Sequence, residues 1–440
     1  MCHPNEARAY QRTPMGRSLS SINTSEKAAF TRGAASFTVD GARQSMRKGP
    51  LSASHTAVWQ IGSGSHAAGF LVQISGALFQ SPIAYYPGKR VWDVAPGYET
   101  LPHIDFNRRV TGECLGCHSN GQPGVPRAID CDRCHGDGDA HALRPSKANI
   151  VNPARLATVE RASVCEQCHL TGIARIPQPG GPEFVPGRKL EESLAVFVRP
   201  SADLKVVSHV EQLALGKCGP NLWCGSCHKP HGEPVSIDAT CTGCHVQRPK
   251  GHAASGCANC HMPKRGAVDG LHTAFTDHRI SRPGQASRVE TAMRPWRATM
   301  NSERNDGLAR LATGDMQGAF RSLTAAYATH PKDPEVLASI GFLLFLKDQQ
   351  ADAAKLLRAA IALKPEHAPY YQKLALALRA GGDKTRAAAA LESAIRFDPL
   401  DETNYHLLAD LEPARRREIL ERYLRVNPQH MATREALAKP

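Results

Sequence analysis

Six copies of the pattern Cys-x-x-Cys-His constrain this chain more than any other feature of its sequence. Two thiols separated by two residues can add across the vinyl groups of a porphyrin, and the His that follows then faces the iron. Zinc knuckles and thioredoxin-like pairs also use Cys-x-x-Cys, but they do not need a His at the next position. We therefore predict six c-type haems. The expected attachment residues are Cys114, Cys117, Cys131, Cys134, Cys165, Cys168, Cys224, Cys227, Cys241, Cys244, Cys257 and Cys260, and the expected proximal ligands are His118, His135, His169, His228, His245 and His261.

Two of the 14 cysteines, Cys2 and Cys218, lie outside these motifs. Cys2 and His3 look like the end of a seventh motif whose first Cys is missing. An N-terminal truncation would explain this pair and also the lack of an export signal. An untruncated chain would then carry seven haems. The alternative is a true start followed by a chance Cys-His pair, and Cys218 is best explained as an isolated thiol.

Distal ligands must come from the nine His residues that lie outside the motifs, in the haem region and in the segment before it. Two axial imidazoles give a closed, low-spin iron that passes electrons and binds no substrate. His209 is a candidate because it falls in a helical stretch that would hold a ligand rigidly, and His252 and His231 are further candidates. Any of these could instead be a surface His or one that bonds a haem propionate.

A second pattern fills the last third of the chain. Pro331, Pro365 and Pro399 are spaced 34 residues apart, and small residues recur at fixed distances before them. The period and the small residues are typical of tetratricopeptide repeats, in which paired helices cross closely. The recurring small residues are Ala319, Ala353 and Ala387, then Ala326, Ala360 and Ala394, and Gly307, Gly341 and Ala375 in the first helices.

These patterns predict a mainly α fold with an irregular haem-packed region and a C-terminal α-solenoid. We expect an N-terminal segment over residues 1–54 that includes the remnant of a truncated haem motif. A small antiparallel β insert should follow over 55–100, with a hairpin turn at 74–77. The multihaem cytochrome c domain should cover 101–280, followed by a linker over 281–303 and the repeats over 304–440. Haem faces should supply the apolar area that this Gly- and Pro-rich region lacks.

The chain resembles bacterial multihaem c-type cytochromes of the hydroxylamine-oxidoreductase-related group that carry C-terminal tetratricopeptide repeats. The resemblance rests on the six motifs, on His135-Gly-Asp-Gly-Asp-Ala-His141, on Cys260-His-Met-Pro263 and on Phe275-Thr-Asp-His-Arg279. It implies that His141 is a distal ligand and that His278 is similar to the distal ligand after the last haem. Ammonia-forming nitrite reductases of this kind have a Lys in one motif, and no Cys-x-x-Cys-Lys occurs here.

The expected function is electron transfer along mostly bis-His haems, with the repeats docking a redox partner protein. The alternative is an enzyme in which one open iron acts on a small nitrogen or sulfur compound; a pure assembly scaffold would not need six haems. The formal charge of +13 is reduced by haem propionates, and the basic residues form no nucleic-acid-binding stripe. No apolar run reaches the length of a membrane span. Because haem is attached outside the bacterial cytoplasmic membrane, we expect a periplasmic or extracellular protein.

Overall fold

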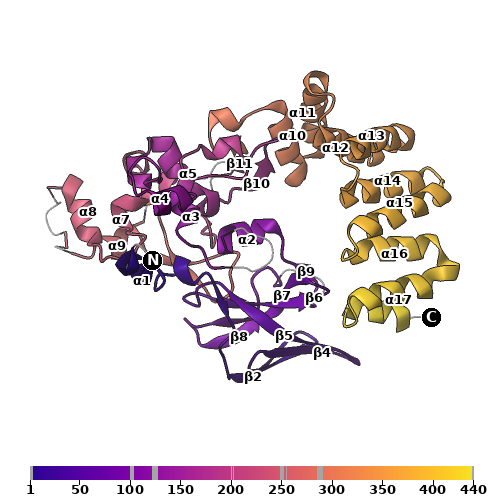
Figure 1. Cartoon of the computed structure of the whole chain (residues 1–440), viewed down its shortest axis with the longest axis horizontal. Coiled ribbons are helices and arrows are strands. Elements are labelled where there is room, and N and C mark those ends of the chain that lie inside the picture. Colours follow the sequence, from indigo (N-terminus) through magenta and orange to yellow (C-terminus); the bar gives the residue numbers. More distant parts are fainter. Residues whose placement is uncertain are drawn as a thin grey trace.

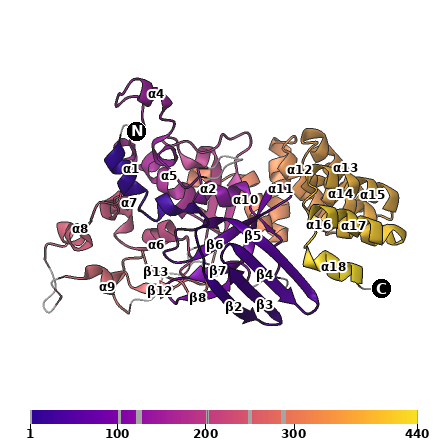
Figure 2. The same ribbon diagram turned by 60° about the horizontal axis from the view of Figure 1, so that its bottom comes forward.

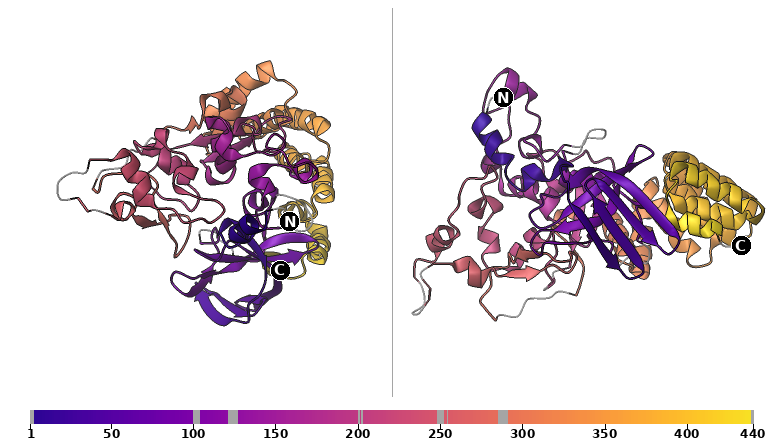
Figure 3. Two further views of the ribbon diagram at one scale, coloured as in Figure 1. Left: turned by 60° about the vertical axis from the view of Figure 1, so that its left-hand side comes forward. Right: turned by 90° about the horizontal axis from the view of Figure 1, so that it is seen from below.

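The computed structural model describes residues 3–99, 104–120, 127–199, 201, 203–247, 252–253, 255–284 and 291–438. Figure 1 shows an antiparallel sheet, a group of short helices on one side of it, and a helical solenoid on the other. The views from other sides agree that the sheet lies between the short helices and the solenoid (Figures 2 and 3). Within the described residues, no helix is both long enough and apolar enough to cross a membrane.

The N-terminal sheet contains nine strands and follows helix α1 (Pro4–Tyr10) and a short 3₁₀ turn (Met15–Arg17). Seven strands pair antiparallel in the order β2-β3-β4-β5-β6-β7-β8, while β1 pairs with β5 and β9 with β7. Arg32 of β2 lies 3.6 Å from Asp93 of β8, so the two end strands approach each other and the sheet is nearly closed. The strands are β1 (Leu19–Ser21), β2 (Lys27–Arg32), β3 (Ala35–Asp40), β4 (Arg43–Lys48), β5 (Leu51–Ile61), β6 (Ala68–Ile74), β7 (Ala77–Tyr86), β8 (Val91–Val94) and β9 (Arg108–Arg109).

Alternation of side chains explains why these segments form strands. Phe37 and Val39 of β3 point into the core, whereas the residues next to them in β3 are exposed or half-buried. Ser75 and Gly76 both have positive φ, as a two-residue hairpin turn requires, so the predicted turn at 74–77 is confirmed between β6 and β7.

The predicted mainly α, haem-packed fold is wrong for the N-terminal part. The sheet runs from β1 to β9, so it starts well before the predicted β insert over 55–100, and residues assigned to an irregular N-terminal segment form β1 to β4. In β4 the alternation of apolar and polar residues that marks a strand is hard to see, because most of its residues are polar or basic. One face of this antiparallel strand meets solvent, so it can carry such residues. The sheet also has an apolar core of its own, which includes Phe79, Ile83 and Tyr86.

The middle of the chain is built from short helices and small sheets. It includes a three-stranded sheet of order β10-β11-β14, and β12 pairs with β13. The helices are α2 (Gly112–His118), α3 (Asp132–His135), α4 (Asp139–Leu143), α5 (Thr158–His169), α6 (His209–Leu215), α7 (Cys224–Cys227), α8 (Ile237–Cys244) and α9 (Cys257–His261). The strands are β10 (Ala174–Pro177), β11 (Leu194–Val198), β12 (Lys264–Gly266), β13 (Ala274–Thr276) and β14 (Arg294–Pro295), and short 3₁₀ turns cover Pro153–Arg155, Leu190–Glu192, Gly219–Asn221 and Ala298–Met300.

Residues 291–303, predicted to belong to a linker, pack against the folded core. Phe197 and Val198 of β11 pair with Pro295 and Arg294 of β14. Met300 is completely buried in the cluster around the three-stranded sheet. This segment therefore joins the motif region to the solenoid through a shared apolar core.

The predicted C-terminal solenoid is confirmed. In the part of the chain that the structure describes, nine helices follow one another from residue 303, and most start after an Asp or Ser whose side chain accepts a backbone N–H of the first turn, which stabilises the helix start. They are α10 (Glu303–Ala312), α11 (Met316–Thr329), α12 (Pro334–Phe345), α13 (Gln350–Leu363), α14 (Ala368–Ala380), α15 (Lys384–Phe397), α16 (Glu402–Leu411), α17 (Arg416–Val426) and α18 (Met431–Ala438), with a 3₁₀ turn at Pro413–Arg415. The recurring alanines are all buried where paired helices cross.

The solenoid contacts the rest of the chain at both ends. At its start, Ala309 of α10 is buried in the cluster around the three-stranded sheet. At its end, Met431 of α18 is buried in the core of the N-terminal sheet. Figure 1 shows the solenoid arching from α10 near β10 and β11 to α17 beside the N-terminal sheet. The repeats are therefore integrated into the fold at two places.

Candidate metal centres

The six Cys-x-x-Cys-His motifs share one local structure. Each lies within or at the end of a short helix, namely α2, α3, α5, α7, α8 or α9. One helical turn brings residues three apart onto the same face, so the two thiols of a motif lie side by side and the His follows at the helix end. All 13 cysteines in the described part of the chain are free thiols. Cys2 lies outside the described residues.

Four predicted proximal ligands each lie beside one predicted distal candidate. The ring centres are 6.0 Å apart for His135 and His231, and 6.1 Å apart for His228 and His278. They are 5.9 Å apart for His252 and His261, and 5.4 Å apart for His169 and His209. In three of the pairs tertiary folding has brought together residues that are far apart in the chain, whereas His252 and His261 are close in sequence.

The three separations of 5.9–6.1 Å match two imidazoles that bind opposite sides of one metal ion, and the 5.4 Å between His169 and His209 is shorter. A His–metal bond is about 2 Å long, so two such bonds in line put the ring centres about 6 Å apart. The angle between the two ring planes can take any value about that axis. It is 13° for His135 and His231 and 84° for His169 and His209.

The Nδ1 atoms of several of these rings are engaged by backbone carbonyl groups. His135 Nδ1 is 2.7 Å from Val151 O, and His261 Nδ1 is 2.9 Å from Ser281 O. His278 Nδ1 is 2.9 Å from the carbonyl oxygen of Thr276, two residues earlier in the chain. An Nδ1–H donated to a carbonyl fixes the tautomer and leaves Nε2 unprotonated, as a metal ligand requires.

Burial keeps the central histidines neutral. Desolvation, and then the nearby His278, His169 and His228, lower the pKa of His209 to about 3. Burial also lowers the pKa of His169 and of His278. A neutral imidazole is the form that can bind a metal ion, and burial favours that form at these three histidines.

Neighbouring motifs touch one another. Cys168 of α5 donates to Gly116 O of α2 at 3.8 Å, and the thiols of Cys165 and Cys224 lie close enough to affect each other's pKa. Further along, Thr240 of α8 donates to Ser226 O of α7. The motifs in α2, α5, α7 and α8 therefore form a continuous series.

The same series extends at each end. Asp238 of α8 accepts N–H groups from Gly256 and Cys257 at the start of α9. Gln167 of α5 donates to Arg133 O of α3 at 3.0 Å. The six motif helices thus lie in contact from α2 and α3 through to α9, which Figure 2 shows near the edge of the molecule.

Two motif histidines have no second imidazole beside them among the described residues. His118 is half-buried, and burial lowers its pKa. His245 is exposed at the end of α8. The fifth distal candidate, His141, lies beside His3, with ring centres 6.2 Å apart.

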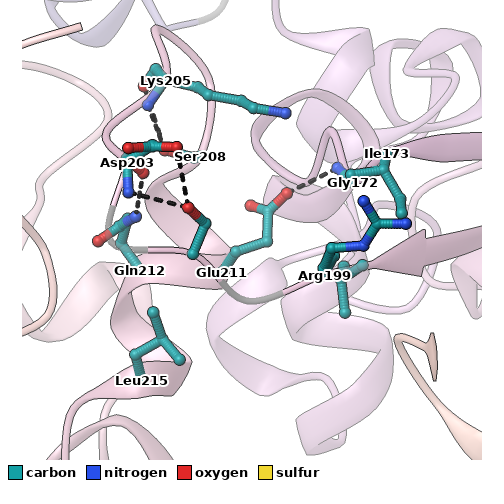
Figure 4. Close-up of a pocket in the computed structure, with 11 residues that line it drawn as sticks. Gly172, Ile173, Arg199, Asp203, Lys205, Ser208, Glu211, Gln212 and Leu215 are labelled. Atoms are coloured by element: carbon teal, nitrogen blue, oxygen red, sulfur yellow. Dashed lines mark hydrogen bonds between the residues drawn. The ribbon is translucent and has the colours of Figure 1, made fainter. Parts of the chain in front are cut away.

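A small cavity lies beside the helix that carries His209 (Figure 4). Its volume of about 40 Å³ has room for about three water molecules. Glu211 anchors α6 here by accepting the backbone N–H groups of Thr171 and Gly172, and burial raises its pKa. These two hydrogen bonds fix α6, and with it His209, beside the end of the motif helix α5.

The sequence named these histidines as candidates but did not predict which of them lie side by side. The resemblance compared His278 with the ligand after the last haem, whereas the structure places it beside His228 and gives His261 the partner His252. The carbonyls that orient the rings, such as Val151 O, had no sequence signal, because every residue carries a carbonyl. Within the described residues, no three His, Cys, Asp or Glu side chains gather to hold a bare metal ion.

Comparisons with known proteins concern the solenoid. A family model described as tetratricopeptide repeat matches residues 310–375. Among solved structures, the chain is similar to an O-GlcNAc transferase mutant from Thermobaculum terrenum, at 24% identity and a TM-score of 0.27 over 28% of this chain and 25% of that chain. It therefore spans about a quarter of the length of that transferase.

The chain is also similar to MamA from Desulfovibrio magneticus RS-1, at 20% identity and a TM-score of 0.27 over 30% of this chain and 75% of that chain. The first TPR of Spaghetti (RPAP3), bound to an HSP90 peptide, matches at 18% identity and a TM-score of 0.25 over 26% of this chain and 89% of that chain. No curated protein matches the chain. The repeat match and the paired helices together show that the region from α10 onward is a tetratricopeptide-repeat solenoid, an architecture that offers an extended surface for binding other proteins.

Proposed function

We propose that this protein is a multihaem c-type cytochrome that carries electrons, and that its repeat solenoid docks a protein partner. The observation that supports the proposal most strongly is the set of four imidazole pairs, each joining a motif His to a His outside the motifs at 5.4–6.1 Å. If the Cys-x-x-Cys pairs bound zinc or acted as thiol-redox centres, a second imidazole beside each motif His would not be required.

The residues present fit haem c. In each motif the two cysteines would hold the porphyrin through thioether bonds and the adjacent His would bind the iron, which supplies one-electron redox chemistry when bound. The second His of each pair would close the other face of the iron. Two imidazoles leave no position for a substrate, which favours electron transfer over catalysis at these four sites.

Contact between successive motif helices supports passage of electrons from one site to the next. The thiol contact between Cys165 and Cys224 brings two attachment sites together. His209 lies 4.8 Å, between ring centres, from His278, which belongs to the next pair. Covalent haem attachment implies a periplasmic or extracellular location.

The proposal is tested by measuring haem in the chain exported together with a haem-attachment system. We expect covalent haem at all six motifs, measured by pyridine haemochrome and intact mass. Electron paramagnetic resonance of the oxidised protein should show mostly low-spin iron. Four or fewer haems, or bound zinc in their place, would overturn the proposal.

A second candidate function is catalysis at one open iron. It is favoured by His118 and His245, for which the described residues offer no second imidazole. A high-spin signal that disappears when nitrite or hydroxylamine is added would support this function. Absence of any such signal would leave electron transfer as the proposed role.

A further inference from the structure

His141 lies beside a His that belongs to no complete motif. Its ring centre is 6.2 Å from that of His3, and the two planes differ by 16°. Three pairs that include a motif His have ring centres 5.9–6.1 Å apart and planes 13–26° apart. The His3–His141 pair therefore has nearly the same geometry as three of the four pairs that we assign to haem.

His141 is held in the manner of the other candidate ligands. Its Nδ1 lies 3.1 Å from Ser146 O and 3.1 Å from Asn149 Oδ1. Asn149 is itself fixed, because its amide donates to Ala140 O and Arg144 O. With Nδ1 engaged in this way, Nε2 is the ring nitrogen available to a metal.

His3 is also positioned by the fold. It is the residue before α1, and its carbonyl accepts the N–H of Ala7 at 3.0 Å. The Tyr10 hydroxyl of α1 donates to Ile129 O, just before the motif that ends in His135. The N-terminal turn is thus anchored to the motif region.

We propose that His3 and His141 are the two axial ligands of a further haem, additional to the six at complete motifs. The proposal rests on the proposed haem function. In the sequence, Cys2 precedes His3 as Cys precedes His at the end of each motif. The ligand class is a porphyrin-bound iron, because two imidazoles on one axis leave the equatorial plane free for four other donors.

The position of this site suggests its role. Gly232, next to His231, lies against Thr13 and Ala9 at the end of α1, so the new site adjoins the His135–His231 pair. Figure 2 shows α4 and the N-terminus at one end of the motif region and α9 at the other. The further haem would extend the series of sites to the end opposite α9.

The test compares total haem and spin state in the full exported chain and its variants. We expect seven haems per chain in the unchanged protein, by pyridine haemochrome against amino-acid analysis. His3→Ala and His141→Ala should each remove one haem or convert one low-spin iron to high-spin, while the other six signals stay unchanged. His141→Met, which keeps a ligand, should keep that iron low-spin with a shifted signal.

His231→Ala is the matched control, because it should open the iron at 131–135 without changing the haem count. Six haems that are insensitive to His3→Ala and His141→Ala would overturn the further site and leave the proposed function intact. The further site would also be overturned if His141→Ala opened one of the six motif haems. Loss of haem at the complete motifs themselves would instead overturn the proposed function.

Discussion

A histidine that binds iron needs one ring nitrogen free and a fixed orientation, and the fold provides both through backbone carbonyls. Val151 O serves His135, and Ser281 O serves His261. Each carbonyl comes from a segment 16 to 20 residues beyond its His. The loops between motifs therefore hold the ligands in place as well as connecting the helices.

The pairing of distal ligands leads to a prediction at single residues. His278→Ala should create one high-spin iron at 224–228, and His252→Ala should create one at 257–261, because each removes the second imidazole from a different pair. The double variant should then show two high-spin irons by electron paramagnetic resonance, since independent sites add. His272→Ala is the control, because His272 is hydrogen-bonded to Asp93 away from the motifs. One high-spin iron in the double variant would show that both residues serve the same haem.

Asp105 gives a prediction about pH. This carboxylate is buried, accepts the N–H groups of Met431 and Phe106, and has its pKa raised to about 6 by burial. Among the groups around it, Arg434 lowers its pKa. Asp105 in turn raises the pKa values of Glu402 and Tyr423.

Because the pKa is raised on folding, the native state binds more protons than the unfolded state between about pH 4 and pH 6. The stability from protonated Asp105 is present below about pH 4 and is lost as pH rises through about 6. Relative to Asp105→Asn, the unchanged protein should lose roughly 2–3 kcal/mol of unfolding free energy over this range. Denaturant unfolding at a series of pH values across this range measures the difference, and a flat difference would contradict the assignment.

At the scale of elements, the crossing of α10 and α11 depends on a missing side chain. A Cβ on Gly307 would lie 2.6 Å from Leu323 Cγ and 2.9 Å from the Leu323 backbone nitrogen. Ala375 occupies the equivalent position in α14, carries a Cβ and is buried. The crossing of α14 and α15 therefore has room for a methyl group that the crossing of α10 and α11 lacks.

Gly307→Ala should therefore destabilise the solenoid by about 1–3 kcal/mol, the usual cost of overpacking a filled core. Thermal or denaturant unfolding followed by helix circular dichroism would measure this. Gly88→Ala is a suitable control, because nothing lies near the added Cβ and Gly88 has no positive φ. Equal stability of the Gly307 and Gly88 variants would contradict the close crossing.

At the scale of the whole molecule, the solenoid closes against the N-terminal sheet through specific bonds. Gln429 accepts the N–H of Ser54 and donates to its carbonyl, so it pairs with β5 much as another strand would. Arg109 of β9 makes two hydrogen bonds to Asp398, at 2.7 and 2.8 Å. The last repeat and the sheet are therefore one packed unit.

This arrangement changes what a truncation should do. The repeat pattern alone predicts that deleting 304–440 leaves the haem spectrum intact, because each repeat packs on its neighbours. In the structure, Ala309 of α10 packs in the cluster around β10 and β11, and Arg297 just before it bonds to Glu166 of motif helix α5. Two different truncations should separate the two contacts.

Deleting residues 399–440 should leave the haem spectrum unchanged and speed hydrogen exchange in β5, which loses its cover. Deleting 304–440 should also shift the signal of the haem proposed at 165–169. The deletion removes Ala309 and exposes the apolar cluster around β10 and β11 to solvent, next to the Arg297–Glu166 contact with α5. Hydrogen exchange with mass spectrometry and electron paramagnetic resonance measure the two effects. An unchanged spectrum after the longer deletion would show that the solenoid is independent of the haem region.

Features that are local or periodic could be predicted from the amino-acid sequence alone. The six Cys-x-x-Cys-His motifs are contiguous, so haem attachment at these residues is predicted without a fold and stays a prediction. The 34-residue period predicted the solenoid, because each repeat packs mainly on the next. The hairpin at 74–77 followed from a turn signal between two β-prone runs.

Contacts between distant residues depended on the tertiary structure. The nine-stranded sheet was underestimated, because the solvent-facing residues of β4 hide the alternation that marks a half-buried strand. Partners such as His228 and His278 are separated along the chain, and no local pattern encodes their contact. The closure of the solenoid through Gln429 and Ser54 likewise depends on surfaces that exist only after both parts have folded, because pairing a side-chain amide with a strand edge leaves no periodic trace in the sequence.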